Sequence, residues 1–243
     1  MPAGKNFAGV DLGTENLAAI ACTDGYAAVY KGGAVLSENR LFAKEKAEAV
    51  SIITRGHSRM HASSHHLDFI SRKHGFFMKD IFHKTTTDLV LRLKAHHVGT
   101  VVVGCNKFWK QSVRLGKQND QNFVSVPHDR FRQMFAYKAL RAGITVIEQE
   151  ESYTSKADLA AGDYIPTYGV DDEKAAFSGY RIKRGLYRTH DGQVLNADCM
   201  AAANILRKAF PDVWKGHTDF SFLKVPYSID LVKLDHKRSG RAA

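Results

Sequence analysis

The chain has 243 residues but only three cysteines, and these lie too far apart to form a CxxC pair: Cys22, Cys105 and Cys199. Their number and spacing argue against a disulfide framework and against a zinc site built from four cysteines. The sequence also has no apolar run near the roughly 18 residues that a membrane-spanning helix needs. Its first ten residues contain no apolar signal-peptide core, so we expect a cytoplasmic protein without a membrane partner.

Acidic residues are scarce between Arg55 and Lys117, where the sequence has twelve Lys or Arg residues but only three acids. This segment accounts for nearly all of the net charge of +10, and it holds eight of the twelve histidines. A nucleic acid is one expected partner, because each neutralised phosphate releases condensed counterions. A solvated basic helix face explains the same composition, and composition alone favours neither interpretation.

Short β-like runs near the N-terminus predict three antiparallel strands, at about 7–12, 17–22 and 26–30. The Asp24-Gly25 pair between the second and third runs is typical of a hairpin turn, since both residues tolerate positive φ.

Helical composition and spacing predict helices at about 41–54 and 66–97, with Gly75 bending or interrupting the second. Later parts of the chain predict strands at 100–104 and 144–147 and helices around Phe131–Ala139 and at 198–209. This order of elements predicts a mixed α/β sheet covered by helices.

Acidic residues lie at the ends of three predicted elements: Asp11 in GVDLGTEN, Glu150 and Glu151 in EQEESYTSK, and Asp198 in NADCMAAANI. Cleavage of a phosphodiester by two divalent ions needs several carboxylates around metals about 3.5–4 Å apart, and Mg²⁺ prefers such oxygen ligands. Simpler roles exist, because Asp198 suits the N-cap of the last helix and the glutamates suit a solvated strand end. Asp11 has no such explanation, since apolar residues flank it on both sides.

Five segments of the chain, in this order, resemble the transposon-encoded TnpB (OrfB) nucleases, which are relatives of the type V CRISPR effectors. The segments are GVDLGTENLA, VVVGCNKFWKQ with QNFVSVPH, EESYTSKADL, FSGYRIKRGLY and LNADCMAAANI. They cover most of the chain from Phe7 to Lys208, and EESYTSK and IKRGLY are more specific than any single acidic motif.

The resemblance implies an α/β, ribonuclease H-like (RuvC) nuclease domain over residues 1–210, followed by a C-terminal tail at 211–243. It implies Asp11 as the first metal ligand and Asp198 as the last, with Mg²⁺ or Mn²⁺ as the cofactor. It further implies a transposon-associated DNA endonuclease of the prokaryotic cytoplasm or nucleoid, whose full-length relatives are guided by RNA.

Three features depart from the family pattern. Many relatives have Glu at the end of the fourth strand, where this sequence reads Gly104-Cys105. We expect a neighbouring strand to supply that carboxylate: Glu150 and Glu151 are both catalytic candidates, and Glu150 is taken as the metal ligand. The CxxC…CxxC zinc ribbon of many relatives is absent, and an irregular segment at 159–196 stands in its place, so no zinc is expected. The guide-holding N-terminal region is also missing, which leaves guided cutting open.

Basic and aromatic side chains in these segments are the expected contacts with DNA, and with guide RNA if one is bound: Lys84, Lys107, Trp109, Lys110, Arg114, Lys117, Lys183 and Arg184. Phe108 and Trp109 stand between two lysines, where they suit stacking on a base, although a hydrophobic plug under the loop is the slightly favoured role.

Two other functions compete with the nuclease. The first is a truncated or nuclease-dead descendant that keeps its nucleic-acid-binding surface. The second is an actin-like or sugar-kinase-type ATPase, because VDLGTENLAAIACTDG also resembles the phosphate-binding hairpin of that superfamily. The second Gly-rich phosphate loop of such ATPases is not evident, and the sequence says nothing about the oligomeric state.

Overall fold

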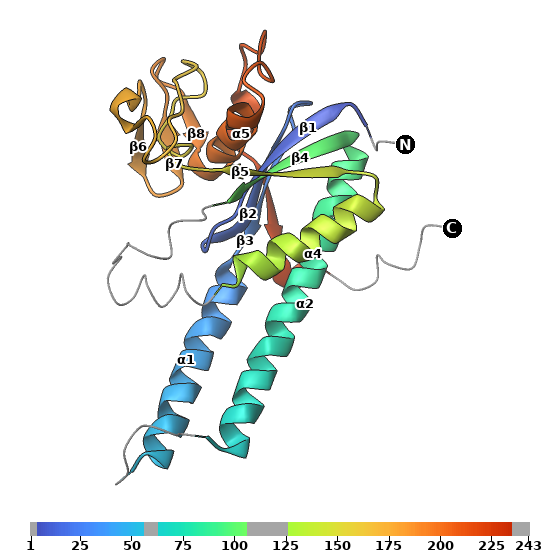
Figure 1. Cartoon of the computed structure of the whole chain (residues 1–243), viewed down its shortest axis with the longest axis vertical. Helices are drawn as coiled ribbons and strands as arrows, with labels where there is room; N and C mark the ends of the chain where they lie inside the picture. The colour runs from blue at the N-terminus through green and yellow to red at the C-terminus, as the bar shows by residue number, and fades with distance from the viewer. Residues whose placement is uncertain (1–3, 56–62, 106–125, 235–243) are drawn as a thin grey trace.

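The computed structural model describes residues 4–55, 63–105 and 126–234, and its centre is a six-stranded mixed sheet (Figure 1). The strands follow the order β5-β4-β1-β2-β3-β9. The first three strands are antiparallel neighbours, as predicted: β1 (Asn6–Asp11), β2 (Asn16–Cys22) and β3 (Ala27–Lys31). Gly25 has a φ of 87° in the turn between β2 and β3, which explains the Asp-Gly pair there.

Parallel strands extend this meander on both sides. β4 (Val98–Cys105) pairs with β1, and β5 (Thr145–Glu150) pairs with β4. Their carboxyl ends therefore meet the carboxyl end of β1 at one edge of the sheet, which is where ligands bind in many α/β proteins. At the other side, β9 (Tyr227–Asp230) pairs in parallel with β3.

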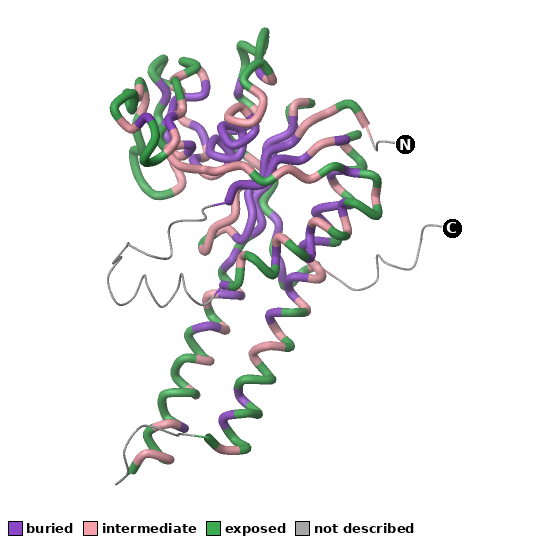
Figure 2. The backbone as a smooth tube through the Cα atoms, in the orientation of Figure 1, coloured by how far each residue is buried: buried purple, intermediate pink, exposed green. Residues whose placement is uncertain are grey.

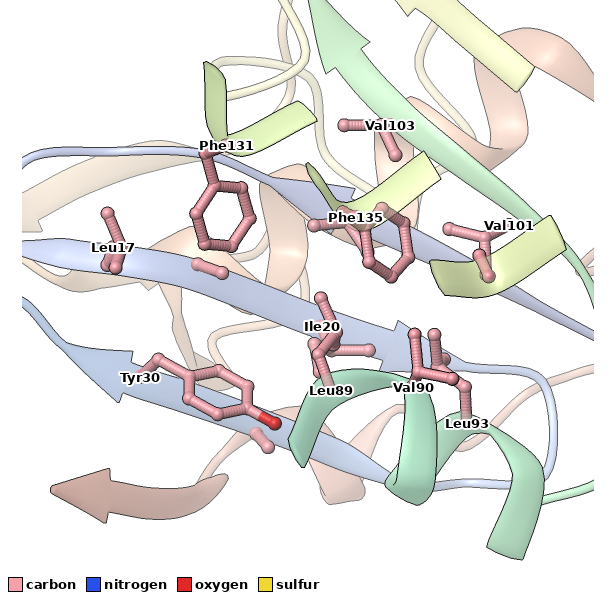
Figure 3. Close-up of a cluster of buried hydrophobic side chains, with 14 of the residues drawn as sticks. Leu17, Ile20, Tyr30, Leu89, Val90, Leu93, Val101, Val103, Phe131 and Phe135 are labelled. Carbon is pink, nitrogen blue, oxygen red and sulfur yellow. The ribbon is translucent and has the colours of Figure 1, made fainter. Parts of the chain in front are cut away.

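Helices cover the two faces of the sheet, which confirms the predicted α/β class. α2 (His65–Ala95) and α4 (His128–Arg141) lie on one face, where Phe131 and Phe135 pack beside Ile20 (Figure 3). α5 (Ala197–Ala209) covers the other face. A Cβ on Gly9 of β1 would collide with the Ala202 carbonyl, so glycine is required for this close approach.

α1 (Gly33–Ile53) lies beside the N-terminal half of α2, and the two project together from the sheet, while the C-terminal half of α2 packs on the sheet (Figures 1 and 2). α2 is one continuous helix of 31 residues, so the predicted interruption at Gly75 is wrong. A single glycine costs a helix about 1 kcal/mol relative to alanine, and burial of Ile70 and Met78 on either side offsets that cost.

The segment at 159–196, predicted to be irregular, contains a small antiparallel sheet: β6 (Tyr180–Lys183), β7 (Leu186–Arg188) and β8 (Val194–Asn196). The short 3-10 helix η3 (Asp172–Lys174) precedes it. The segment expected as a tail provides β9 and two further 3-10 helices, η4 (Ser221–Leu223) and η5 (Leu231–Lys233). Trp214 of that segment is buried and donates its indole N–H to the Ala203 carbonyl, 3.1 Å away.

Among the described residues no helix is long and apolar enough to cross a membrane.

Candidate functional site

A pocket of about 310 Å³ lies at the edge of the sheet where β1 ends. The turn between β1 and β2, the end of β5, the first turn of α5 and the β6–β7 hairpin all contribute to its lining. The lining residues that carry charge or a side-chain amide are Asp11, Glu15, Asn16, Glu151, Arg181, Arg184 and Asp198. Three of the four predicted catalytic carboxylates therefore line one pocket.

Asp11 is the last residue of β1 and pairs in register with Ala19 of β2. Residues 8–10 before it are fully or almost fully buried, so the strand carries the carboxylate directly from the core to the pocket. This position matches the expectation that Asp11 has no ordinary structural role.

Asp198 is not the N-cap of α5, which was its simpler interpretation. Asn196 caps the helix instead, and its side chain accepts hydrogen bonds from the backbone N–H groups of Asp198 and Cys199. The Asp198 carboxylate is thereby free to enter the pocket, where Asn16 Nδ2 donates to its Oδ2 at 2.6 Å. Arg181 Nη2 lies 3.8 Å from its Oδ1.

The two adjacent glutamates point to different surroundings. Glu151 lines the pocket, whereas Glu150 pairs with Lys208 at 2.6 Å and accepts hydrogen bonds from Ser152. A Cβ on Gly104 would collide with Glu151 Oε2. Glu151 thus fills the space beside the end of β4 where the family pattern places a glutamate on β4 itself, and the geometry favours Glu151 over Glu150 as the third carboxylate.

Two carboxylates of the pocket, those of Asp11 and Glu151, have raised pKa values. Burial raises the pKa of Asp11 well above its usual range, the charges of Glu151 and Asp198 raise it further, and Arg181 opposes the rise. Burial also raises the pKa of Glu151 to about 7, against the opposing charges of Arg132 and Lys208. A cation bound beside Asp11 and Glu151 would favour the charged forms of both carboxylates and so oppose these shifts.

The donor set fits a hard divalent cation. In the part of the chain that the structure describes, no three His, Cys, Asp or Glu side chains converge as a preformed ligand cage. Mg²⁺ does not require such a cage, because it keeps several of its waters and is commonly held by one or two carboxylates together with substrate phosphates. Asp11, Glu151 and Asp198 are the residues that would hold it.

The β6–β7 hairpin brings two arginines to the pocket. Arg184 was predicted as a nucleic-acid contact, and its Nε lies 2.6 Å from Glu15 Oε2. Arg181 and Asn16 were missed by the sequence interpretation. The segments FSGYRIKRGLY and GVDLGTEN contain them, but nothing local to either segment indicates that they meet Asp198.

The other predicted contacts are separate from the pocket or not described. Lys84 lies on α2 and pairs with Asp80 at 2.6 Å, and Lys183 is exposed at the end of β6. Phe108 lies outside the described residues. So do five further predicted contacts: Lys107, Trp109, Lys110, Arg114 and Lys117.

Comparison with protein families gives two matches on successive parts of the chain. Residues 1–109 match the OrfB_IS605 family, described as a probable transposase. Residues 128–205 match the Cas12f1-like TNB domain.

Among curated proteins, the TnpB-like protein ORF457 of Acidianus two-tailed virus is 24% identical over 216 residues. The match covers 86% of this chain but 43% of the relative, so the chain spans less than half the length of that relative.

Among solved structures, the cryo-EM structure of a Cas12f1–sgRNA–target DNA complex matches with a TM-score of 0.56 at 15% identity. It covers 84% of this chain and 50% of that chain. A CRISPR-Cas12f ternary complex matches with a TM-score of 0.58 at 17% identity, over 83% of this chain and 38% of that one.

The structural matches confirm the RuvC-type fold, and the family matches support a transposon-associated RuvC-like nuclease at the level of the family. Taken together, the family models and the curated relative show that the chain is similar to the TnpB (OrfB) family over most of its length, and the solved structures show the shared fold.

Proposed function

We propose that the chain is the core of a metal-dependent DNA endonuclease, in which Asp11, Glu151 and Asp198 hold Mg²⁺ or Mn²⁺. The observation that carries this proposal is that three carboxylates, from β1, the end of β5 and α5, line one pocket although they are far apart in the sequence. The divalent ions, when bound, would supply an activated water and stabilise the leaving oxygen.

Two residues of the chain would orient a metal ligand and bind the substrate phosphate beside the ions. Asn16 fixes one oxygen of Asp198 by its hydrogen bond and leaves the other oxygen facing Arg181. The Arg181 side chain is 42% exposed and its partner lies 3.8 Å away, so a phosphate oxygen can replace that weak contact. Arg181 is therefore the proposed phosphate-binding residue of the site.

DNA is the proposed substrate because the similar Cas12f1 structure is a complex with target DNA and because this chain is strongly basic, with a net charge of +10. The same complex contains a single guide RNA. The ATPase alternative is less favoured, since the second Gly-rich phosphate loop of such ATPases is not evident in the sequence.

The test is Mg²⁺- or Mn²⁺-dependent cleavage of labelled single- and double-stranded DNA by the wild type, by Asp11→Asn and by Asp212→Asn. Loss of one carboxylate removes several kcal/mol of metal-assisted stabilisation, so Asp11→Asn is expected to cut at least about 100-fold more slowly. Asp212 is a matched control, because its side chain is 88% exposed and pairs with Lys215 only at 4.0 Å.

Equal cleavage by all three proteins contradicts the assigned site. No cleavage by the wild type, with salt-sensitive DNA binding retained, favours the nuclease-dead alternative. Saturable ATP binding at the same pocket would instead favour the ATPase.

A further inference from the structure

Lys208 is a buried cation at the end of the helix that carries Asp198. Its side chain is 7% exposed, and its Nζ lies within hydrogen-bonding distance of four oxygens. These are Glu150 Oε2 at 2.6 Å, the Pro166 carbonyl at 2.7 Å, and the carbonyl and Oγ of Ser152 at 3.2 and 3.3 Å. Three ammonium protons serve these acceptors, so Lys208 is fully engaged inside the protein.

Both oxygens of Glu150 are engaged as well. The Ser152 backbone N–H donates to Oε1 at 2.7 Å, and the Ser152 hydroxyl donates to Oε2 at 2.8 Å, beside the Lys208 ammonium. A carboxylate with these partners is held firmly, and it is not among the residues that line the pocket. Glu150 is therefore placed to fix the backbone at the end of β5 rather than to bind a ligand.

The turn that follows β5 is attached to the same helix at a second point. Thr154 donates its N–H and hydroxyl to the Glu151 carbonyl, and Asn204 Nδ2 donates to the carbonyls of Thr154 and Ala157. Asn204 and Lys208 are four residues apart, so they lie on one face of α5. One helix thus presents Asp198 to the pocket directly, holds the Glu150 side chain before Glu151, and holds the backbone that follows Glu151.

The carboxylate of Glu151 packs on one side against the end of β4 at Gly104. A methyl group on Gly104 would collide with its Oε2 and would lie 2.7 Å from Ile205 Cδ1. A small shift of the strand end therefore displaces the carboxylate from the wall that it packs against.

We propose that Lys208 is a positioning residue, which acts through its ion pair with Glu150 to hold the Glu151 carboxylate beside Asp11 and Asp198. The two consecutive glutamates then have separate duties: Glu151 faces the cation, and Glu150 anchors the strand. This inference rests on the proposed function, because it assigns a role toward the same cation site.

The experiment compares the variants Glu150→Gln, Glu151→Gln and Lys208→Met. It adds the double variant Glu150→Lys/Lys208→Glu, in which the two charges are exchanged. Glu148→Gln is the control, since Glu148 lies on the same strand with a side chain that is 51% exposed. Three quantities are measured on each folded protein: Mn²⁺ affinity by calorimetry, DNA cleavage, and hydrogen exchange of the peptide at 148–156.

Glu151→Gln is expected to lose Mn²⁺ affinity while the exchange of 148–156 stays unchanged. Glu150→Gln and Lys208→Met are expected to lower Mn²⁺ affinity about 10- to 100-fold, as is typical when the partners of metal ligands are removed. In both of these variants the exchange of 148–156 should rise, the KM for DNA should stay constant, and the double variant should recover part of the affinity.

The outcomes separate the two proposals. A wild type that binds no Mn²⁺ and cuts no DNA overturns the proposed function and the positioning role with it. A wild type that binds Mn²⁺, with a folded Lys208→Met variant that binds it equally well, overturns the positioning role alone. Loss of affinity in Glu150→Gln without any change in exchange also overturns it, because Glu150 would then be a direct ligand.

Discussion

Glycine at position 104 leaves space that the Glu151 side chain occupies. The Glu151 carboxylate lies where a Cβ on Gly104 would be, and Ile205 of α5 closes the space from the other side. Gly104→Ala is expected to destabilise the fold by about 1 kcal/mol, the low end of the usual cost of an added methyl group, because the atoms it would meet are the flexible ends of the Glu151 and Ile205 side chains. It should also weaken Mn²⁺ binding, because the carboxylate must move.

Gly75→Ala is the matched control for that exchange. A Cβ at this position meets no atom within 4 Å, and the residue lies in the middle of α2. Alanine should therefore stabilise the protein by roughly 0.5–1 kcal/mol, through helix propensity, and leave metal binding unchanged. Urea unfolding and calorimetry measure both effects, and a stabilising Gly104→Ala contradicts the packing argument.

Asp158 is a second residue whose surroundings define a prediction. Its side chain is fully buried and accepts hydrogen bonds from the backbone N–H groups of Ala160, Ala161 and His190, and it pairs with the His190 ring at 3.2 Å. Asparagine offers a donor in place of one acceptor, so Asp158→Asn is expected to cost about 1–3 kcal/mol of unfolding free energy. Asp212→Asn, on the exposed surface, should cost nothing measurable by urea unfolding.

The sequence predicted the pocket residues only in part. Asp11 and Asp198 were predicted as ligands by the resemblance, and both line the pocket. The choice between Glu150 and Glu151 was open, because it depends on Lys208, which lies 58 residues along the chain from Glu150. Arg181 was missed for the same reason, since a contact across a fold leaves no local pattern.

At the scale of elements, strong local patterns predicted well and weak ones did not. β1, β2 and β3 are confirmed, since buried β-like runs alternate with turn residues there. β9 was not predicted, because it is a four-residue edge strand with only Ile229 buried. α1 begins at Gly33, about eight residues before the predicted start, because an Ala-rich composition appears only in its second half.

Lys138 links α4 to α2 and gives a prediction about pH. Its Nζ donates to the His83 carbonyl and to the hydroxyls of Thr86 and Thr87, at 2.7–2.8 Å. Burial lowers the pKa of Lys138 to about 8. Between about pH 8 and the value of about 10.4 for an unfolded lysine, the folded protein binds fewer protons than the unfolded chain, so folding is favoured as pH rises.

The stability of the wild type relative to Lys138→Met is therefore expected to rise between pH 7.5 and pH 9.5. Urea unfolding at the two pH values measures the difference, and the comparison with the variant removes the contributions of other titrating groups. A difference that does not change with pH would contradict the assignment to Lys138.

At the scale of the whole molecule, the class of the fold was predictable but the arrangement of its sheet was not. The order of strands and helices predicted a mixed α/β sheet with helices on it. In the sheet, β4 and β5 lie on the β1 side and β9 lies beside β3. This order depends on how α2 and α5 pack on the two faces of the sheet. Local periodicity in the sequence does not contain that information. The pocket exists because this arrangement brings three strand and helix ends to one edge.

The net charge of +10 suits the proposed binding of DNA, whose salt dependence is expected to count the phosphates that the protein contacts directly. Each contact weakens binding by roughly 3- to 4-fold between about 50 and 200 mM salt. Arg184 pairs with Glu15 in an exposed contact, with side chains 71% and 48% exposed, so a phosphate competes easily for the guanidinium. Arg184→Ala should therefore lower the slope of log K against log salt by about 1.

Arg141 provides the comparison for this slope. It is exposed at the end of α4, close to Thr145, the first residue of β5. Glu150 and the pocket lie at the opposite end of that strand. Arg141→Ala removes the same charge from the molecule, yet it should leave the slope unchanged in a filter-binding or fluorescence titration. Equal slopes for the two variants would mean that DNA affinity depends on net charge alone. They would contradict the prediction that the edge of the pocket contacts the phosphate backbone.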